Sequence, residues 1–303
     1  MSSTKPMRVL ISGASGLIAT ELSKQLVEQG HEVVKLVRRN AKSPNEVQWN
    51  PDELYLPEGV IDNIDAVVNL AGATTGRIPW TRKYKTEIVN SRINSTKTLV
   101  NAMTKANKRP AVFISGSASG FYGDRGAELL NESAGKGTGF LSDLSFDWEQ
   151  EAQLAPKDVR VVLVRTTMVM SRKLGALGRL LPLIKLGVGG ALGSGKQFWA
   201  WITVVDEAAA IIHLIKTPSA NGPFNLTAPE PATCKQIIQA LGRSLKRPTI
   251  FAVPGWALRL LLGEAATELL LTSQNMTATK LLETGFKFSH PDLKSAAEWV
   301  TAK

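Results

Sequence analysis

One short segment near the start of the chain has the glycine spacing of a phosphate-binding turn. It reads GASGLIA over Gly13–Ala19, a GxxGxxA pattern between a β-branched run and a helical pattern. Gly13 would allow a tight turn, Gly16 would let the backbone approach a pyrophosphate, and Ala19 would let the helix pack closely on the strand. The anion would lie at the N-terminus of that helix. The segment therefore predicts a dinucleotide-binding site, and the alternative is a structural turn.

Two arginines follow the next β-branched run, at the position where such sites recognise the ribose. Arg38 stands 22 residues after Gly16, Arg39 follows it, and no acid occupies this point. An acidic side chain there would bind the ribose of NAD, whereas an arginine favours the 2′-phosphate of NADP. A guanidinium can donate several hydrogen bonds to such a phosphate. The sequence favours NADP(H) over NAD(H), with two solvated arginines at a strand end as the alternative.

Side chains that could hold a metal or attack as a thiolate are scarce. The three histidines, His31, His213 and His290, are far apart, and Cys234 is the single cysteine. Neither a metal site nor cysteine catalysis is predicted. Two further glycine-rich segments fail as catalytic motifs. Gly190–Gln197 ends in Gln where a P-loop has a hydroxyl, and Gly116–Gly120 has Ala at the centre where a nucleophile elbow has Ser.

The glycine segment needs a sheet and a helix to hold it, and the hydrophobic pattern predicts both. Apolar residues spaced as one helix face follow the glycines and stop near Gly30, and a longer helical pattern covers residues 81–106. This alternation predicts an α/β fold, a Rossmann doubly wound parallel sheet. The expected strands are Arg8–Ser12, Glu32–Val37, Ala66–Leu70, Ala111–Ser115 and Val159–Val164.

The pattern changes beyond about residue 170. A strand-like run covers Phe198–Val205, a helix is expected from Asp206, and Phe224–Leu226 and Thr249–Val253 are of extended type. These short strands would need partners. We therefore expect an NADP-binding domain over residues 1–170 and a smaller α/β substrate-side region over 171–303, interleaved with the first domain.

Composition narrows the class of protein. The 303 residues are 44% hydrophobic and 20% charged, which is typical of a globular protein. No run approaches the ~20 apolar residues of a membrane span, and no signal-peptide core is visible. A cytoplasmic protein without a membrane or nucleic-acid partner is expected. The net charge of +10 is dispersed along the chain, and most of it has no assigned role.

Four segments together carry a family resemblance: Gly13–Ala19, Asn69–Gly72, Ser115–Asp124 and Gly193–Ile202. They resemble the extended short-chain dehydrogenase/reductases, and specifically the atypical "epimerase family protein" subgroup of the NAD-dependent epimerase/dehydratases, which has a DUF1731-type C-terminal region. The resemblance covers essentially the whole chain. It implies a Rossmann fold, a nicotinamide cofactor of the NADP type and a small-molecule substrate of unassigned identity.

The resemblance also implies which residues meet the cofactor. On physical grounds alone, Glu87 and Arg92 would be a solvated helix face. Together with Gly13, Gly16 and Gly72 of the motifs, the expected contacts are Ser15, Leu17, Ile18, Arg38, Arg39, Leu70, Ala71, Glu87, Arg92 and Val169.

The acid/base group of the superfamily is missing at its usual spacing. These enzymes use a Tyr with a Lys four residues later, whose charge lowers the pKa of the phenol. None of the three tyrosines, Tyr55, Tyr84 and Tyr122, has that lysine. The family pattern places the Tyr and the Lys at positions 143 and 147. This sequence has aspartate at both, Asp143 and Asp147, and so departs from the pattern.

Two residues remain as catalytic candidates. Ser117 stands where the family has the hydroxyl that orients the substrate oxygen, and Tyr122 follows the same strand end. Our hypothesis is that Tyr122 or a group on the substrate handles the proton, with Ser117 as hydrogen-bond donor. The alternative is that both residues only pack and satisfy a loop.

A tryptophan-rich segment completes the candidate site. Gln197, Trp199 and Trp201 could form a wall of the substrate pocket beside a flexible glycine loop. The alternative is core burial of an alternating strand. The leading hypothesis is an NADP(H)-dependent oxidoreductase or epimerase-like enzyme acting on a carbonyl, alcohol or sugar-like compound, as a monomer or homodimer. A non-catalytic NADP-binding sensor or scaffold on the same fold is the alternative.

Overall fold

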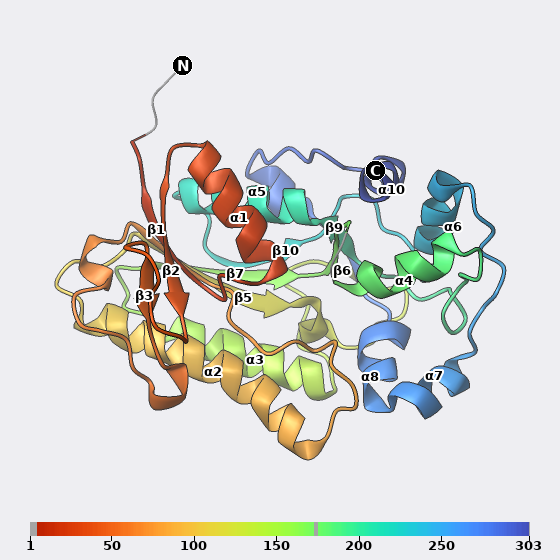
Figure 1. The fold of residues 1–303 in the computed structure, drawn as a ribbon, viewed down its shortest axis with the longest axis horizontal. Coiled ribbons are helices and arrows are strands. Elements are labelled where there is room, and N and C mark those ends of the chain that lie inside the picture. The colour runs from red at the N-terminus through yellow and green to blue at the C-terminus, as the bar shows by residue number, and fades with distance from the viewer. Residues whose placement is uncertain (1–4, 173–174, 303) are drawn as a thin grey trace.

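A parallel sheet is the centre of the computed structural model, which describes residues 5–172 and 175–302 (Figure 1). In this part of the chain seven strands pair in the order β10-β7-β5-β4-β1-β2-β3, and every pair is parallel. This is the doubly wound order. The chain adds strands from β1 toward one edge of the sheet, then returns to β4 beside β1 and adds strands toward the other edge, so the order of addition reverses between these two strands. The strands are β1 Arg8–Ser12, β2 Glu32–Val37, β3 Glu46–Gln48, β4 Ala66–Asn69, β5 Val112–Ala118, β7 Arg160–Thr166 and β10 Gly222–Leu226.

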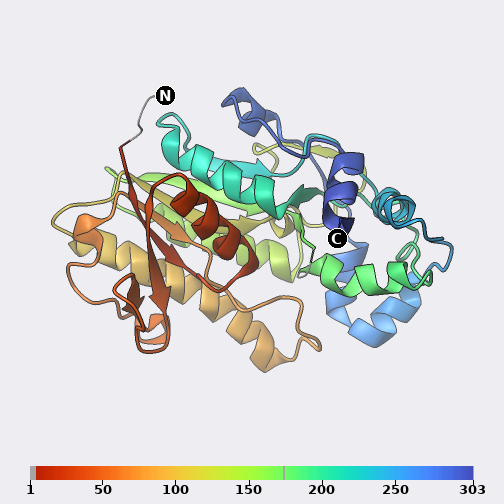
Figure 2. The same cartoon turned by 45° about the horizontal axis from the view of Figure 1, so that its top comes forward.

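The central strands are mainly apolar because helices cover both faces of the sheet. Val9 and Ile11 belong to a core cluster with α1 (Leu17–Glu28) and α5 (Val204–Lys216). Leu10, between them, belongs to the cluster with α2 (Arg82–Lys105) and α3 (Phe140–Gln153). Figure 2 shows α1 and α5 on one side of the sheet and α2 on the other.

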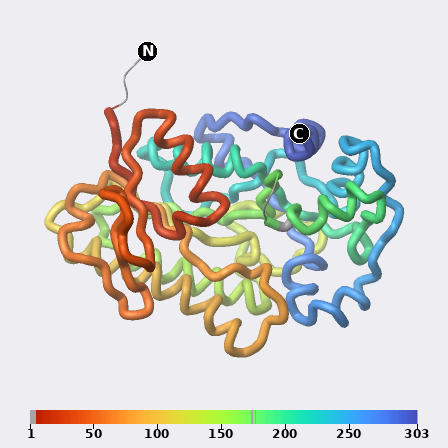
Figure 3. The backbone as a smooth tube through the Cα atoms, in the orientation of Figure 1, coloured from red at the N-terminus to blue at the C-terminus, as the bar shows by residue number. Residues whose placement is uncertain are grey.

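The C-terminal part of the chain gathers at one end of the sheet, where the green and blue segments of the tube meet (Figure 3). It has its own core cluster, which includes Trp199, Trp201, Ile237 and Leu258. Two short parallel pairs, β6–β11 and β8–β9, complete this end. The elements are β6 Leu129–Leu130, β8 Met168–Met170, α4 Ala176–Lys185, β9 Trp201–Thr203, α6 Cys234–Leu245, α7 Gly255–Leu262, α8 Glu264–Ala266, a π-helical turn Thr267–Leu271, β11 Asn275–Met276, α9 Thr279–Glu283 and α10 Leu293–Thr301.

The five strands expected in the first half are confirmed: β1 and β2 have the expected bounds, and the ends of the other three differ by at most three residues. Phe224–Leu226 lies in β10, which extends the main sheet beside β7. The expected strand Phe198–Val205 is limited to Trp201–Thr203, because Thr203 caps α5 and the helix begins at Val204. The expected strand Thr249–Val253 was wrong: only Val253 forms a bridge, with Leu192.

The two parts of the chain share the main sheet. Both β10 and α5 come from beyond residue 170, yet β10 pairs with β7 and α5 packs on α1. This arrangement agrees with an interleaved second region, and the boundary at residue 170 stays a prediction. Within the described residues, no helix has both the length and the apolar character to cross a bilayer.

Candidate functional site

The glycine loop lies where β1 and β4 end side by side. Gly13 has a φ of +65°, and a Cβ at this position would stand 2.4 Å from the carbonyl oxygen of Leu70 and 2.9 Å from the nitrogen of Ala71. Only glycine allows both this backbone conformation and this approach. The loop after β1 therefore touches the Leu70–Gly72 segment after β4, at the point where doubly wound sheets bind their ligands.

The N-terminus of α1 is free to receive an anion. Helix α1 begins at Leu17, and its N-cap residue Gly16 makes no side-chain capping bond. The N–H groups of the first turn therefore lack partners within the helix, and the helix dipole adds partial positive charge there. Ser15, Leu17 and Ile18 are all part of this turn region. A dinucleotide pyrophosphate fits this arrangement.

The two arginines after β2 differ in what holds them. Arg39 donates to both carboxylate oxygens of Glu46, at 2.8 and 2.7 Å, and to the carbonyl of Asn40. Arg38 is exposed and has no ion pair with any residue that the structure describes. Because Glu46 already holds the Arg39 guanidinium, Arg38 is the more available donor for a phosphate at this strand end.

A cavity of about 830 Å³ opens at the carboxyl end of the sheet. Its first wall is the sheet edge and the turn of α1, the second is α2 and α3, and the third is the C-terminal region. The first wall consists of Ile18, Leu70, Gly116–Gly120 and Thr166–Val169. The second consists of Arg92, Leu141, Leu144, Ser145 and Trp148. The third consists of Leu180, Leu192, Phe198–Ala200, Leu262, Glu268–Leu270 and Gln274. Ile18, Leu70, Arg92 and Val169, all predicted cofactor contacts, therefore meet in one cavity.

Arg92 is a partly buried cation that lines this cavity. Its guanidinium donates to the carbonyls of Ala73 and Ile88, lies against Gly72, and stands 5.3 Å from the ring of Trp148. Burial lowers the pKa of Arg92 to about 10, and no carboxylate of the described residues pairs with it. A partly buried cation without an acidic partner favours an anionic ligand. Glu87 on the same helix is exposed and does not line the cavity.

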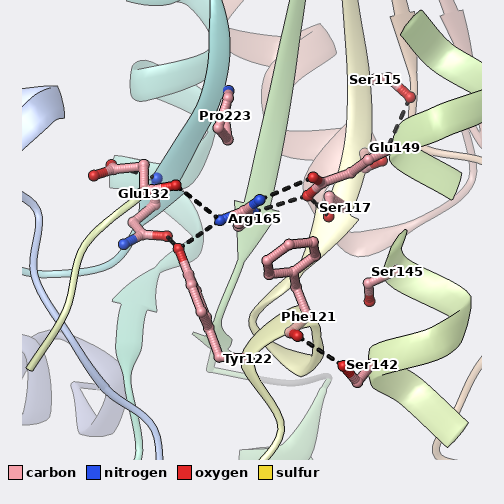
Figure 4. A network of polar contacts seen from close by, with 12 residues as sticks. Ser115, Ser117, Phe121, Tyr122, Glu132, Ser142, Ser145, Glu149, Arg165 and Pro223 are labelled. Carbon is pink, nitrogen blue, oxygen red and sulfur yellow. Dashed lines mark hydrogen bonds and ion pairs between the residues drawn. The ribbon is translucent and has the colours of Figure 1, made fainter. Parts of the chain in front are cut away.

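Ser117 faces the cavity at the end of β5 and is held from behind by a buried network (Figure 4). Its hydroxyl donates to Glu149 Oε1 at 2.6 Å. Glu149 also forms a two-point ion pair with Arg165, with N–O distances of 2.8 and 2.9 Å. Because a carboxylate can only accept, the Ser117 proton points to Glu149 and the oxygen lone pairs remain for a ligand. Ser117 is thus an acceptor toward the cavity, not the donor that the sequence suggested.

Tyr122 lies at the other end of this network and not in the cavity. Its hydroxyl donates to Asn225 Oδ1 at 2.7 Å and accepts from Arg165 at 2.8 Å. The side chain is fully buried in a cluster with Phe121 and Leu130, and burial raises its pKa to about 12. The turn Ser119–Tyr122 directs this side chain into the core, so the structure does not support Tyr122 as the acid.

Helix α3 presents a different face from the one that the family pattern suggested. Asp143 and Asp147 are exposed, and Asp143 pairs with Lys136. The cavity is faced by Leu141, Leu144, Ser145 and Trp148, which are spaced as one side of a helix. The assignment of the Tyr and Lys positions to Asp143 and Asp147 was therefore wrong, since it placed them on the solvent side of α3.

Of the three predicted substrate contacts, only Trp199 lines the cavity. Trp201 is fully buried in the C-terminal core, where its indole donates to the carbonyl of Glu230. Gln197 is also buried, and its amide donates to the carbonyls of Leu192 and Leu270. Trp201 and Gln197 hold the C-terminal region together behind the cavity wall through these hydrogen bonds.

Glu268 is a site residue that the sequence reasoning missed. It is the one acidic side chain among the described residues that line the cavity, and it lies on the π-helical turn, a rare conformation often found at functional sites. Its carboxylate accepts from the Leu141 backbone N–H, in the first turn of α3. Burial raises the pKa of Glu268 above its ordinary value. No motif marks it, because it comes from the far end of the chain.

A second buried carboxyl group stands directly behind the cavity wall. Glu207 on α5 is fully buried, and its Oε1 accepts from the hydroxyl of Thr166, which lines the cavity. Its Oε2 has no hydrogen-bond partner among the described residues. Burial raises the pKa of Glu207 to about 8, so the group is mostly protonated at neutral pH.

Comparison with protein families gives two matches. The NAD dependent epimerase/dehydratase family matches residues 9–227, and a domain of unknown function, DUF1731, matches residues 253–300. The first match spans the main sheet and the cofactor loop, and the second spans the turn that carries Glu268.

Individual relatives match along the whole length. Epimerase family protein ML0860 of Mycobacterium leprae is 37% identical over 298 residues, which are 97% of this chain and 96% of the relative. Human epimerase family protein SDR39U1 is 33% identical over 299 residues, 98% of this chain and all of the relative. A crystal structure of that human protein (isoform 2) with NADPH has a TM-score of 0.90 and 32% identity, covering 97% of this chain and 99% of the other.

Proposed function

The chain belongs to the NAD dependent epimerase/dehydratase family, and from this we propose that it is an NADP(H)-dependent oxidoreductase or epimerase-like enzyme. Its substrate would be a small carbonyl, alcohol or sugar-like compound bound in the cavity. The cofactor would supply or accept a hydride at a substrate carbon. The glycine loop, the free N-terminus of α1 and the unpaired Arg92 fit a dinucleotide, and the relative crystallised with NADPH supports the NADP form.

One observation carries the proposal of catalysis: a fixed hydroxyl and a single carboxyl group share a cavity at the cofactor edge of the sheet. Ser117 would accept a hydrogen bond from a hydroxyl group of the bound substrate through its lone pairs, since Glu149 holds its proton. Glu268 would give a proton to the substrate carbonyl oxygen when it is reduced, and would take a proton from the alcohol when it is oxidised. The raised pKa of Glu268 makes its protonated form more accessible than that of an ordinary carboxyl group.

The test is turnover on a panel of aldehydes, ketones and sugar nucleotides, measured as the oxidation of NADPH or the reduction of NADP⁺. Once a substrate is found, Ser117→Ala is expected to lower kcat by about 10²-fold, because the substrate is no longer positioned, and Glu268→Gln by about 10²–10⁴-fold. The affinity for NADPH should change little in either variant. Tyr122→Phe is the control, because Tyr122 lies outside the cavity, and it should keep most of the activity.

Two results would contradict these roles. If Tyr122→Phe loses activity while Glu268→Gln keeps full activity, Tyr122 and not Glu268 is the proton donor. Tight NADPH binding without turnover on the whole panel would favour a non-catalytic sensor or scaffold. That second candidate has its own support, because the residues of α3 that face the cavity include neither Tyr nor Lys.

The preference for the 2′-phosphate can be tested separately at the end of β2. Arg38→Ala is expected to weaken NADPH binding by about 10–100-fold, since hydrogen bonds from a charged donor contribute about 1.5–3 kcal/mol, and to leave NADH binding unchanged. Arg39→Ala is the matched control, because Glu46 already holds that guanidinium. Fluorescence titration of both nucleotides measures the ratio. NADH binding as tight as NADPH in the unmodified chain would overturn the proposal.

Location and assembly are proposed from the sequence alone. We propose that the protein is cytoplasmic and acts as a monomer or homodimer.

A further inference from the structure

One end of the molecule presents large apolar side chains to solvent. Leu183, Leu186 and Val188 lie on and after α4, and Ile250 and Phe251 lie before α7; all are between 48% and 76% exposed. The two segments run side by side, because the N–H of residue 251 donates to the carbonyl of residue 189 and that of residue 253 donates to residue 191. These five side chains therefore belong to one continuous surface.

Helix α7 continues this surface. It begins two residues after the bridge at Val253, and it buries only Leu258 fully. Trp256, Leu260 and Leu261 are 69–79% exposed, on the side of the helix where polar residues are usual. We call the eight exposed residues together the apolar end; a patch of this kind on a folded protein marks an interaction site. Figure 1 shows α4 and α7 at the same end of the chain fold.

The two segments that carry the apolar end are also rich in basic residues. Residues 172–263 contain eleven Lys and Arg against three Asp and Glu, a surplus of eight out of the total of ten. Two of the three acids, Asp206 and Glu207, are fully buried. The segments 176–190 and 243–262 hold six basic residues and no acid. Lys185, Arg247 and Arg259 are exposed and form no ion pair with a described residue.

We propose that the apolar end docks on the surface of an anionic lipid bilayer. Tryptophan and leucine side chains would enter the boundary between headgroups and acyl chains, and the surrounding lysines and arginines would contact the anionic headgroups. Charge argues against a second copy on this face, because two such surfaces would oppose like charges. Eight exposed apolar side chains argue against nucleic acid, whose affinity comes mainly from phosphate contacts.

The docking surface adjoins the cavity. Leu180 on α4 and Leu262 at the end of α7 line the cavity, so the helices that carry the apolar end also form part of the cavity wall. This contact would be peripheral, since no described helix can span a bilayer. It differs from the sequence-based expectation of a protein without a membrane partner, and it assigns a role to basic residues of these two segments. It does not depend on the proposed enzymatic activity.

Vesicle sedimentation of the full chain tests the proposal. The protein is mixed with vesicles of phosphatidylcholine alone, or of phosphatidylcholine with phosphatidylglycerol, at low and high salt. We expect binding only to the anionic vesicles, weakened by salt. The triple variant Trp256→Ser, Leu260→Ser, Leu261→Ser should reduce the bound fraction at least about tenfold, and so should Lys185→Glu, Arg247→Glu, Arg259→Glu.

Matched variants elsewhere on the surface serve as controls. Val27→Ser, Leu129→Ser, Leu154→Ser removes equally exposed apolar side chains, and Lys24→Glu, Lys97→Glu, Lys157→Glu reverses three exposed lysines. Both should bind vesicles like the unmodified chain, and circular dichroism confirms folding of all four. The proposal is overturned by no binding to anionic vesicles at low salt, or by equal loss in the controls. It is also overturned by a dimer in solution that only the serine variant of the apolar end disrupts.

Discussion

Arg165→Met is expected to lower the free energy of unfolding by about 3–5 kcal/mol, because it leaves the Glu149 carboxylate buried without its cation. The pair is nearly inaccessible to solvent, with side chains 4% and 5% exposed. Arg165 also stands 3.6 Å from the ring centre of Phe121 and donates to Tyr122. Losing the guanidinium therefore breaks contacts of three residues around β5 and β7.

Urea unfolding measures this effect, and the chain offers a matched control. Arg109 pairs with Asp158 at 2.8 Å, but both side chains are well exposed. Arg109→Met should cost under about 1 kcal/mol, as is usual for a surface pair. The double variant Glu149→Gln, Arg165→Met should recover part of the loss, since it removes the uncompensated charge. If Arg165→Met lowers the free energy of unfolding no more than Arg109→Met does, the buried ion pair does not contribute more to stability than a surface pair.

The same network prepares Ser117 for its proposed role. Glu149 is held at two points by Arg165 and accepts the Ser117 proton. The orientation of this hydroxyl thus depends on a strand and a helix that the ion pair ties together. Variants that weaken the pair are therefore expected to lower both the stability and the affinity for a substrate oxygen.

Gly13→Ala is expected to abolish NADPH binding, with a dissociation constant raised more than about 100-fold. A Cβ at this position would overlap the backbone of Leu70 and Ala71, and neither atom group can move without separating the two loops of the cofactor site. The φ of +65° adds strain of about 1–2 kcal/mol for any residue with a side chain. Both effects act on the junction of β1 and β4.

A second glycine, Gly30, provides a control that distinguishes the effect of steric overlap from that of backbone strain. Gly30 has a φ of +79°, but nothing lies within 4 Å of a Cβ placed there. Gly30→Ala should therefore lose about 1–2 kcal/mol of stability and keep its affinity for NADPH. Titration of nucleotide fluorescence and thermal unfolding of both variants make the comparison. If Gly13→Ala binds NADPH as Gly30→Ala does, the junction of the two loops is not the cofactor site.

Local patterns were enough to predict the Rossmann sheet and its glycine loop. The β-branched runs, the helix that stops near Gly30 and the GxxGxxA turn each depend on residues close together in the chain. The motif also carried the family resemblance, which the match over residues 9–227 confirms. Ser117 was found because the family resemblance places the orienting hydroxyl at this position.

The site itself was decided by contacts between distant segments. Helix periodicity near residue 143 does not say which side meets the cavity until α3 packs on the sheet, and so Asp143 and Asp147 were misplaced. The sequence also could not show that Arg165 would pair with Glu149, or that Tyr122 would turn into the core.

The amino-acid sequence alone determined the fold class, the family and the glycine loop, because short-range spacing encodes them. Only the tertiary structure decided which groups line the cavity and which exposed apolar segments lie side by side. Glu268 reaches Leu141 across 127 residues of chain, and the apolar end joins α4 to α7. These contacts depend on how the C-terminal region packs on the sheet. Such a long-range arrangement cannot be predicted from the spacing of residues close together in the chain.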